Sequence, residues 1–211
     1  MKIPRVYPIL DTQSLEARAC DPETATLAWL DAGTRILQFR HKRQWTRPVF
    51  DQAEQIASAC RERGAVLVIN DRADVAKLLG AGLHLGQDDL APGDARRLLG
   101  AEAFLGYSTH NLQQIDAAAA EPVSYVAFGP VFSTASKENP DPVVGLDELR
   151  ACRARCDRPL VAIGGITRQN VAAVFAAGAD SVAVIGDLLP EDCSVANLRR
   201  RMEEWQQLAQ M

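Results

Sequence analysis

The sequence predicts an α/β fold in which eight parallel strands close into a barrel, the (β/α)₈ arrangement of TIM barrels. Short apolar runs alternate eight times with longer helical patterns along the 211 residues, with no break in composition. The runs are almost wholly apolar, as expected of strands that helices cover on the outside. An open doubly wound sheet is the rival, but its glycine-rich first turn is missing, because the first run is followed by Asp11-Thr12-Gln13. We therefore expect residues 1–211 to form one barrel domain.

The elements follow one another in a regular order. Ala-Gly pairs at residues 32–33, 81–82 and 177–178 precede strands, where glycine allows the left-handed residue that ends a helix. The strands are expected at residues 6–10, 36–39, 66–69, 82–85, 104–107, 125–128, 160–163 and 181–184. The helices are expected at residues 22–31, 48–63, 73–79, 92–99, 112–119, 146–155, 169–177 and 196–210.

Composition excludes several classes of function. The net charge is −4 with both signs mixed along the chain, and no basic run exceeds Arg199-Arg200-Arg201, so we expect no nucleic-acid partner. No apolar stretch approaches membrane-spanning length, and the first residues lead straight into a strand, so neither a membrane segment nor a signal peptide is expected. The cysteines are odd in number and scattered, which argues against a disulfide framework and for the cytoplasm. They are Cys20, Cys60, Cys152, Cys156 and Cys193.

Charged side chains lie at the C-terminal end of the second expected strand. Side chains alternate across a strand, so Gln38, Arg40 and Lys42 would share one face if the strand continued. Two cations and an amide at a barrel mouth suit an anion such as a diphosphate, because buried cations need anions to meet them. The alternative, a solvated loop holding Arg40 and Lys42, is about equally favoured by spacing alone.

Acidic residues follow the next two strands. Asp71 ends the third, and Asp88 and Asp89 follow the fourth. Carboxylates from neighbouring strand ends could share a Mg²⁺, with water and diphosphate oxygens completing its shell. The alternative is that Asn70 or Asp71 caps the helix expected from residue 73.

The remaining strand ends also carry polar groups. Ser108 could donate to a phosphate or a substrate ring, or begin the next helix, which Asn111 is expected to cap. The longest loop, residues 129–142, holds Thr134, Ser136 and Lys137, a set that suits a phosphate-binding lid. Gly165 and Gly186, after strands seven and eight, suit a backbone phosphate site, so two phosphorylated substrates are expected to meet across the mouth. No catalytic role is assigned to the histidines, His41, His84 and His110.

At these residues the sequence resembles the thiamine phosphate synthase family over nearly its whole length. The segments that carry the resemblance are Gln38-Phe39-Arg40-His41-Lys42, Asn70-Asp71, His84-Leu85-Gly86-Gln87-Asp88-Asp89, Gly129-Pro130-Val131-Phe132 with Thr134 and Ser136-Lys137, and Ile163-Gly164-Gly165-Ile166. The resemblance implies a transferase that joins 4-amino-2-methyl-5-hydroxymethylpyrimidine diphosphate to a thiazole phosphate, releasing diphosphate first and needing no general base. A homodimer of this enzyme is possible.

The resemblance also implies roles for individual residues. Asp71 and Asp89 would bind Mg²⁺, and Arg40, Lys42, Ser108 and Lys137 would act on the departing diphosphate. The pyrimidine diphosphate would contact Gln38, Arg40, Lys42, Asn70, Ser108 and Lys137, and Phe39 and His41 are included among the binding positions. The thiazole phosphate would contact Thr134, Ser136, Gly165, Ile185 and Gly186. Ala135 is also counted among the substrate-binding positions. Ser136 and Gly186 stand where the family commonly has threonine and serine.

Two other functions remain open at this point. A thiazole tautomerase of the same superfamily would share the barrel and the thiazole phosphate site, but it would lack the paired carboxylates and the Gln-x-Arg-x-Lys strand. A non-catalytic sensor of thiazole phosphate would need no metal pair and would show no Mg²⁺-dependent release of diphosphate.

Overall fold

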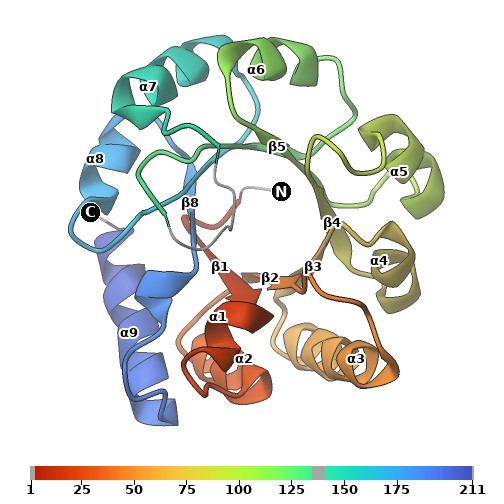
Figure 1. Cartoon of the computed structure of the whole chain (residues 1–211), viewed down its shortest axis with the longest axis vertical. Coiled ribbons are helices and arrows are strands. Elements are labelled where there is room, and N and C mark those ends of the chain that lie inside the picture. The colour runs from red at the N-terminus through yellow and green to blue at the C-terminus, as the bar shows by residue number, and fades with distance from the viewer. Residues whose placement is uncertain (1–2, 135–140, 211) are drawn as a thin grey trace.

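The computed structural model describes residues 3–134 and 141–210, and its eight strands form a closed parallel barrel in sequence order, β1 to β8 (Figure 1). The strands are β1 Val6–Asp11, β2 Ile36–Arg40, β3 Val66–Asn70, β4 Gly82–Leu85, β5 Leu105–Thr109, β6 Tyr125–Phe128, β7 Leu160–Ile163 and β8 Ser181–Val184. The pairing of β1 with β8 closes the barrel, which confirms the predicted fold class.

Helices surround the barrel (Figure 1). They are α1 Thr12–Glu16, α2 Pro22–Asp31, α3 Arg47–Glu62, α4 Ala73–Leu79, α5 Pro92–Leu99, α6 Leu112–Ala118, α7 Gly145–Arg155, α8 Val171–Ala176 and α9 Val195–Leu208, with a 3₁₀ turn, η1, at Gly186–Leu188. The predicted bounds of α2, α4 and α5 are confirmed. Sequence patterns missed α1 and η1, because each is too short to show a helical period.

Several strands reach further toward their C-terminal ends than the apolar pattern predicts. The prediction of a strand at 104–107 is corrected to Leu105–Thr109, because Ser108 and Thr109 continue the ladder with β6. The Thr109 hydroxyl donates to the Ala127 carbonyl at 2.8 Å, so a polar side chain is satisfied inside the sheet. Asp11, Arg40 and Asn70 also lie within strands rather than in loops. The C-terminal ends of these strands therefore carry polar residues, and the barrel brings those ends to one side.

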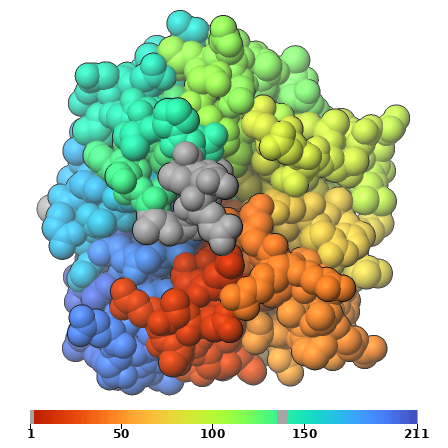
Figure 2. All heavy atoms as spheres, in the orientation of Figure 1, coloured from red at the N-terminus to blue at the C-terminus, as the bar shows by residue number. Residues whose placement is uncertain are grey.

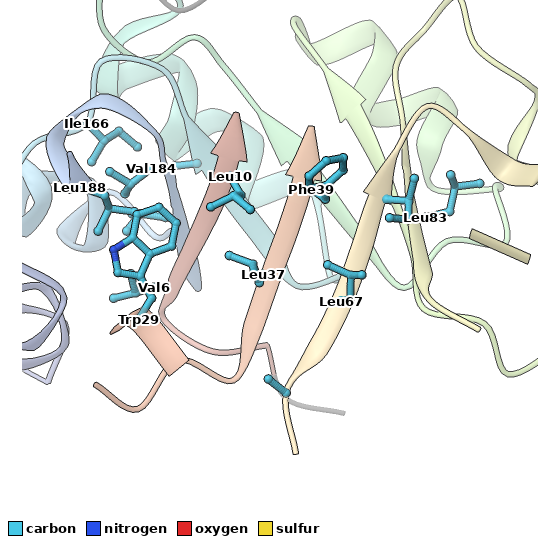
Figure 3. Close-up of a cluster of buried hydrophobic side chains, with 14 of the residues drawn as sticks. Val6, Leu10, Trp29, Leu37, Phe39, Leu67, Leu83, Ile166, Val184 and Leu188 are labelled. Carbon is cyan, nitrogen blue, oxygen red and sulfur yellow. The ribbon is translucent and has the colours of Figure 1, made fainter. Parts of the chain in front are cut away.

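The main hydrophobic core lies between the barrel and its helices. Alternate strand residues such as Leu10, Leu37 and Leu67 point outward into this layer, where Trp29 of α2 is fully buried (Figure 3). Burial of each such side chain contributes about 1.5–3 kcal/mol. This outer layer holds the strands at a fixed register, and the register decides which side chains face the barrel axis.

A second, smaller core fills the barrel itself, and it is partly polar. Tyr7, Ile36, Val68 and Tyr125 belong to it, and the two tyrosine rings meet edge to face at 5.8 Å between centroids. Gly106 makes room for one of them, because a Cβ at this position would lie 2.0 Å from the Tyr125 Cζ. Among the described helices, none is both long enough and apolar enough to cross a membrane.

Candidate active site at the mouth of the barrel

A cavity of about 400 Å³ opens among the C-terminal ends of the strands. Its wall is mixed, with Ile9, Ile163 and Ile185 beside polar groups, as is usual for small-molecule sites. Seven of the sequence-predicted site residues line it: Gln38, Arg40, Asn70, Thr134, Gly165, Ile185 and Gly186. The structure therefore brings residues from five of the eight βα units to one cavity.

Arg40 enters this cavity from the end of β2 and is held by an acid that sequence reasoning missed. Its Nη1 donates to Asp11 Oδ1, from the neighbouring strand β1, and both side chains are largely buried, at 11% and 3% exposure. Asp11 Oδ2 also accepts from the backbone N–H and hydroxyl of Ser14, at 3.0 and 2.6 Å, which caps α1. The only sequence signal for Asp11 is its place after an apolar run.

Lys42 does not share the inward face of Gln38 and Arg40, because β2 ends at Arg40. The side chain is 42% exposed, and its Nζ donates to Asp71 Oδ2 at 2.6 Å. The expectation of three residues on one strand face is therefore corrected to two. Lys42 instead contributes its charge beside the carboxylate that follows β3.

The side chains of Asp71 and Asp89 come together from consecutive strand ends. Asp71 adopts a left-handed backbone with φ of 64°, and its N–H donates to the His84 carbonyl at 2.8 Å. Partial burial raises the pKa of the Asp89 carboxyl, and the hydrogen bond and charge of Asp71 raise it further. The Gly86 N–H, 2.6 Å from Asp89 Oδ2, and the Lys42 ammonium oppose that rise. Asp88, in contrast, is exposed.

The capping alternative for Asn70 and Asp71 is wrong. The residue before α4 is Arg72, and no side chain caps that helix. Asn70 is 6% exposed and lines the cavity, and its Nδ2 has no hydrogen-bond partner among the described residues. Buried polar groups are almost always paired, so this amide nitrogen is one of the few exceptions among the described residues.

Ser108 lies on the inner face of β5 and does not begin a helix. Its Oγ is 2.9 Å from His84 Nε2. Asn111 caps α6, as predicted, by accepting from the Gln114 N–H at 2.9 Å. His110 was given no role, yet it lines the cavity, with its Nδ1 2.7 Å from the Gly129 carbonyl oxygen.

The opposite wall of the cavity is built from backbone. Gly165 adopts φ of 60°, and a Cβ there would lie 2.4 Å from the Ser133 carbonyl oxygen, so only glycine fits without a shift. Gly186 begins η1, and a Cβ there would meet nothing within 4 Å. The departure from serine at Gly186 is therefore not forced by space.

Some predicted site residues lie elsewhere. The Phe39 side chain points outward into the main core, where it packs edge to face on Trp45 (Figure 3). His41 is partly buried, and its Nδ1 lies 2.8 Å from Thr12 Oγ1. Figure 2 shows that the red surface of the N-terminal part of the chain lies against the orange surface of the segments that follow β2. Ala135, Ser136 and Lys137 fall outside the described residues.

Comparisons with known proteins show the family of this chain. The family model described as thiamine monophosphate synthase matches residues 6–188. The chain belongs to the thiamine monophosphate synthase family. A thiamine-phosphate synthase of Koribacter versatilis is 45% identical over 214 residues, which cover 99% of this chain and 97% of the relative. One of Methanoculleus marisnigri is 44% identical over 160 residues, 75% of this chain and 76% of the relative.

A solved structure of the same kind also matches. The thiamine phosphate pyrophosphorylase from Pyrococcus furiosus superposes with a TM-score of 0.84 at 26% identity, over 98% of this chain and 95% of that one. The superposition thus covers almost the full length of both chains.

Metal ligation in this family member would depend on few side chains. Within residues 3–134 and 141–210, no group of three or more His, Cys, Asp or Glu side chains is placed to hold a metal ion. Asp71 and Asp89 form a pair of interacting carboxylates. A cation bound there would need further oxygens from water or substrate, a mode typical of Mg²⁺.

We expect Asp89→Asn to stabilise the metal-free protein at neutral pH. The pKa of Asp89 is raised, so the folded state binds a proton at this site more readily than the unfolded chain does, and its contribution to stability falls as pH rises through that range. Removing the charge should raise Tm by about 1–2 °C, a small shift because the site is partly solvated. Thermal unfolding in a chelator measures it.

The gain should vanish at a pH below the ordinary Asp value, about 3.9, where both states are protonated. Asp88→Asn, at the exposed neighbour, is the matched control and should leave Tm unchanged. A lower Tm for Asp89→Asn than for Asp88→Asn at pH 7 would contradict the electrostatic account of this pair.

Proposed function

We propose that the protein is a thiamine-phosphate synthase, a single-domain transferase. Its substrates would be 4-amino-2-methyl-5-hydroxymethylpyrimidine diphosphate and 4-methyl-5-(2-hydroxyethyl)thiazole phosphate, or the carboxylated form of the latter. The observation that carries the proposal is one cluster of groups at the barrel mouth. Arg40, Asn70 and the Asp71–Asp89 pair with Lys42 lie at consecutive strand ends. The names of the relatives support the same activity.

The carboxylate pair fits a Mg²⁺ ion. Two acidic side chains within hydrogen-bond reach of each other repel when both are ionised, and the raised pKa of Asp89 reflects that repulsion together with burial. A divalent cation relieves it, and hard carboxylate oxygens are the ligands that Mg²⁺ prefers. Asp71 and Asp89 would hold the ion, which would supply positive charge for the diphosphate of the substrate.

The protein's own groups would bind and stabilise the departing diphosphate. Arg40 and Lys42 would neutralise charge, and the Asn70 amide would donate to a diphosphate oxygen. We propose that Lys137 contributes another cation and that Ser108 donates from the other side. The pyrimidine methylene carbon loses its bond to the diphosphate oxygen, and the electron pair leaves with the diphosphate. The thiazole nitrogen then donates its lone pair to that carbon, so no base is required.

The second substrate would occupy the backbone wall. Gly165, Ile185 and Gly186 line the cavity, and their N–H groups would meet the phosphate. We propose that the hydroxyls of Thr134 and Ser136 donate to it as well. The apolar side chains Ile9 and Ile163 also line the cavity, and they would exclude water from the carbon that changes partners. Juxtaposition of both substrates would then add to the electrostatic effect.

A direct assay tests the proposal. Both heterocycles mixed with the protein and Mg²⁺ should give equal amounts of diphosphate and thiamine phosphate, and omitting the thiazole phosphate or adding excess chelator should abolish thiamine phosphate. Tautomerisation of the thiazole without coupling, or binding without turnover, would reject the proposal in favour of the two other functions. We further propose a cytoplasmic enzyme and a homodimer, and sedimentation of the purified protein tests the latter.

A further inference from the structure

A continuous chain of hydrogen bonds crosses the interior of the barrel beneath the cavity. Gln38 Nε2 donates to the Tyr7 hydroxyl at 3.1 Å, and this hydroxyl lies 2.9 Å from that of Tyr125. The Tyr125 hydroxyl is 2.9 Å from His84 Nδ1, and His84 Nε2 is 2.9 Å from Ser108 Oγ. The chain thus begins and ends at two residues assigned to the pyrimidine substrate.

The direction of each hydrogen bond in this chain follows from the first. An amide nitrogen can only donate, so the Tyr7 oxygen accepts, and its one hydrogen is left for Tyr125. The one hydrogen of Tyr125 then goes to His84 Nδ1. A ring that accepts at Nδ1 is neutral and carries its hydrogen on Nε2, which therefore donates to the Ser108 oxygen. The Ser108 hydrogen is left to donate into the site.

The interior of the barrel is built to hold this chain. Gln38, Tyr7 and Tyr125 are at most 2% exposed, and His84 is 8% exposed, so water does not compete for their hydrogen bonds. Burial raises the pKa of both tyrosine hydroxyls, so each keeps its single hydrogen. Gly106 pairs with His84 on one side and Tyr125 on the other, and a Cβ there would lie 2.3 Å from the Tyr125 hydroxyl oxygen.

We infer that Tyr7, Tyr125 and His84 are positioning residues, a relay that fixes Gln38 and Ser108 in set donor and acceptor orientations toward the pyrimidine substrate. The role in substrate binding rests on the proposed function, whereas the relay itself does not. The relay residues need not touch the substrate. They act by fixing the rotation of the Gln38 amide and the Ser108 hydroxyl, each of which could otherwise turn either a donor or an acceptor toward the substrate. Residues behind a binding site commonly preorganise it in this way.

The tautomer of His84 tests the relay in the ligand-free protein. Nitrogen-15 NMR of the imidazoles should show Nδ1 of His84 as an acceptor nitrogen and Nε2 as protonated, and with only three histidines in the chain the assignment is tractable. Gln38→Glu cannot donate as a carboxylate, so the chain should reverse and move the hydrogen to Nδ1. A tautomer that is unchanged in Gln38→Glu, or a wild-type ring protonated on Nδ1, would overturn the relay.

Kinetics test the positioning role. Tyr125→Phe keeps the ring that packs on Phe104 but breaks the chain, and it should raise KM for the pyrimidine diphosphate about tenfold, the effect of one lost hydrogen bond. The KM for the thiazole phosphate should stay within twofold, which a general structural defect would not allow. Tyr107→Phe, at a tyrosine on the outward face of β5, is the matched control and should change neither constant. Tyr7→Phe provides a second break if Tyr125→Phe folds poorly.

A double-mutant cycle separates the relay from coupling through bound substrate. The effects of Gln38→Glu and Ser108→Ala on kcat/KM should be non-additive by about fivefold or more when Tyr125 is present, and additive in a Tyr125→Phe background. Coupling that persists in that background would mean transmission through the substrate and would reject the positioning role. If the protein proved to have another activity, the proposed function would be rejected. The tautomer of His84 measured by NMR would still show whether the relay exists.

Discussion

Asp71→Asn should lower kcat by about 10²–10³-fold at saturating Mg²⁺, the range seen when one group that stabilises developing charge is removed. Asp71 Oδ2 accepts a hydrogen bond from Lys42 Nζ at 2.6 Å, and the Asp71 carboxylate also interacts with Asp89. Asp71 therefore contacts both proposed sources of positive charge for the diphosphate, which are Lys42 and the metal ion. The fold should survive, because asparagine tolerates the left-handed backbone of this position better than alanine does. Steady-state assays over a range of Mg²⁺ concentrations measure the effect.

Asp88→Asn is the control for this change, since it removes the same charge from an exposed side chain in the same region. Its kcat should stay within twofold of the wild-type value. A kcat within fivefold for Asp71→Asn at saturating Mg²⁺, with normal folding, would be incompatible with a metal role for this carboxylate. Lys137→Ala is expected to give a similarly severe loss.

Arg40→Ala should reduce both turnover and stability. It removes a cation that we propose contacts the diphosphate, which should cost about 10²–10³-fold in kcat. It also leaves Asp11, whose side chain is 3% exposed, without its cation. Breaking a largely buried pair in this way costs about 2–4 kcal/mol, equivalent to a fall in Tm of about 5–12 °C for a chain of this size. Thermal unfolding and steady-state kinetics on the same preparation measure the two effects.

A second substitution separates these effects. Asp11→Asn combined with Arg40→Ala removes the unpaired charge but keeps an oxygen that can cap α1, so most of the stability should return while turnover stays low. Arg43→Ala, at an exposed ion pair with Glu16, is the matched control and should change Tm by less than about 2 °C. Recovery of turnover in the double variant, or no recovery of Tm, would contradict the assignment of Arg40 and Asp11.

Local patterns in the sequence were sufficient for most of the barrel. Apolar runs separated by helical periods predicted all eight strands, because burial on both faces requires apolar side chains at nearly every position. Polar residues at the ends of those runs meet as the pattern indicates, because all parallel strands end on the same side, and Gln38, Arg40 and Asn70 line one cavity. The pattern could not tell where a strand ends once its residues become polar, so the structure had to decide that β2 stops at Arg40, before Lys42.

Only the tertiary structure decided which polar groups meet across the barrel. Asp11 pairs with Arg40 because the strand register sets them opposite one another, 29 residues apart in sequence. Tyr7 and Tyr125 are separated by 118 residues and meet only inside the closed barrel. A sequence determines which faces are apolar and which strand ends carry charge, because both are properties of single segments. Hydrogen bonds between inward-facing side chains depend on curvature, register and closure, which arise only when all eight segments pack together.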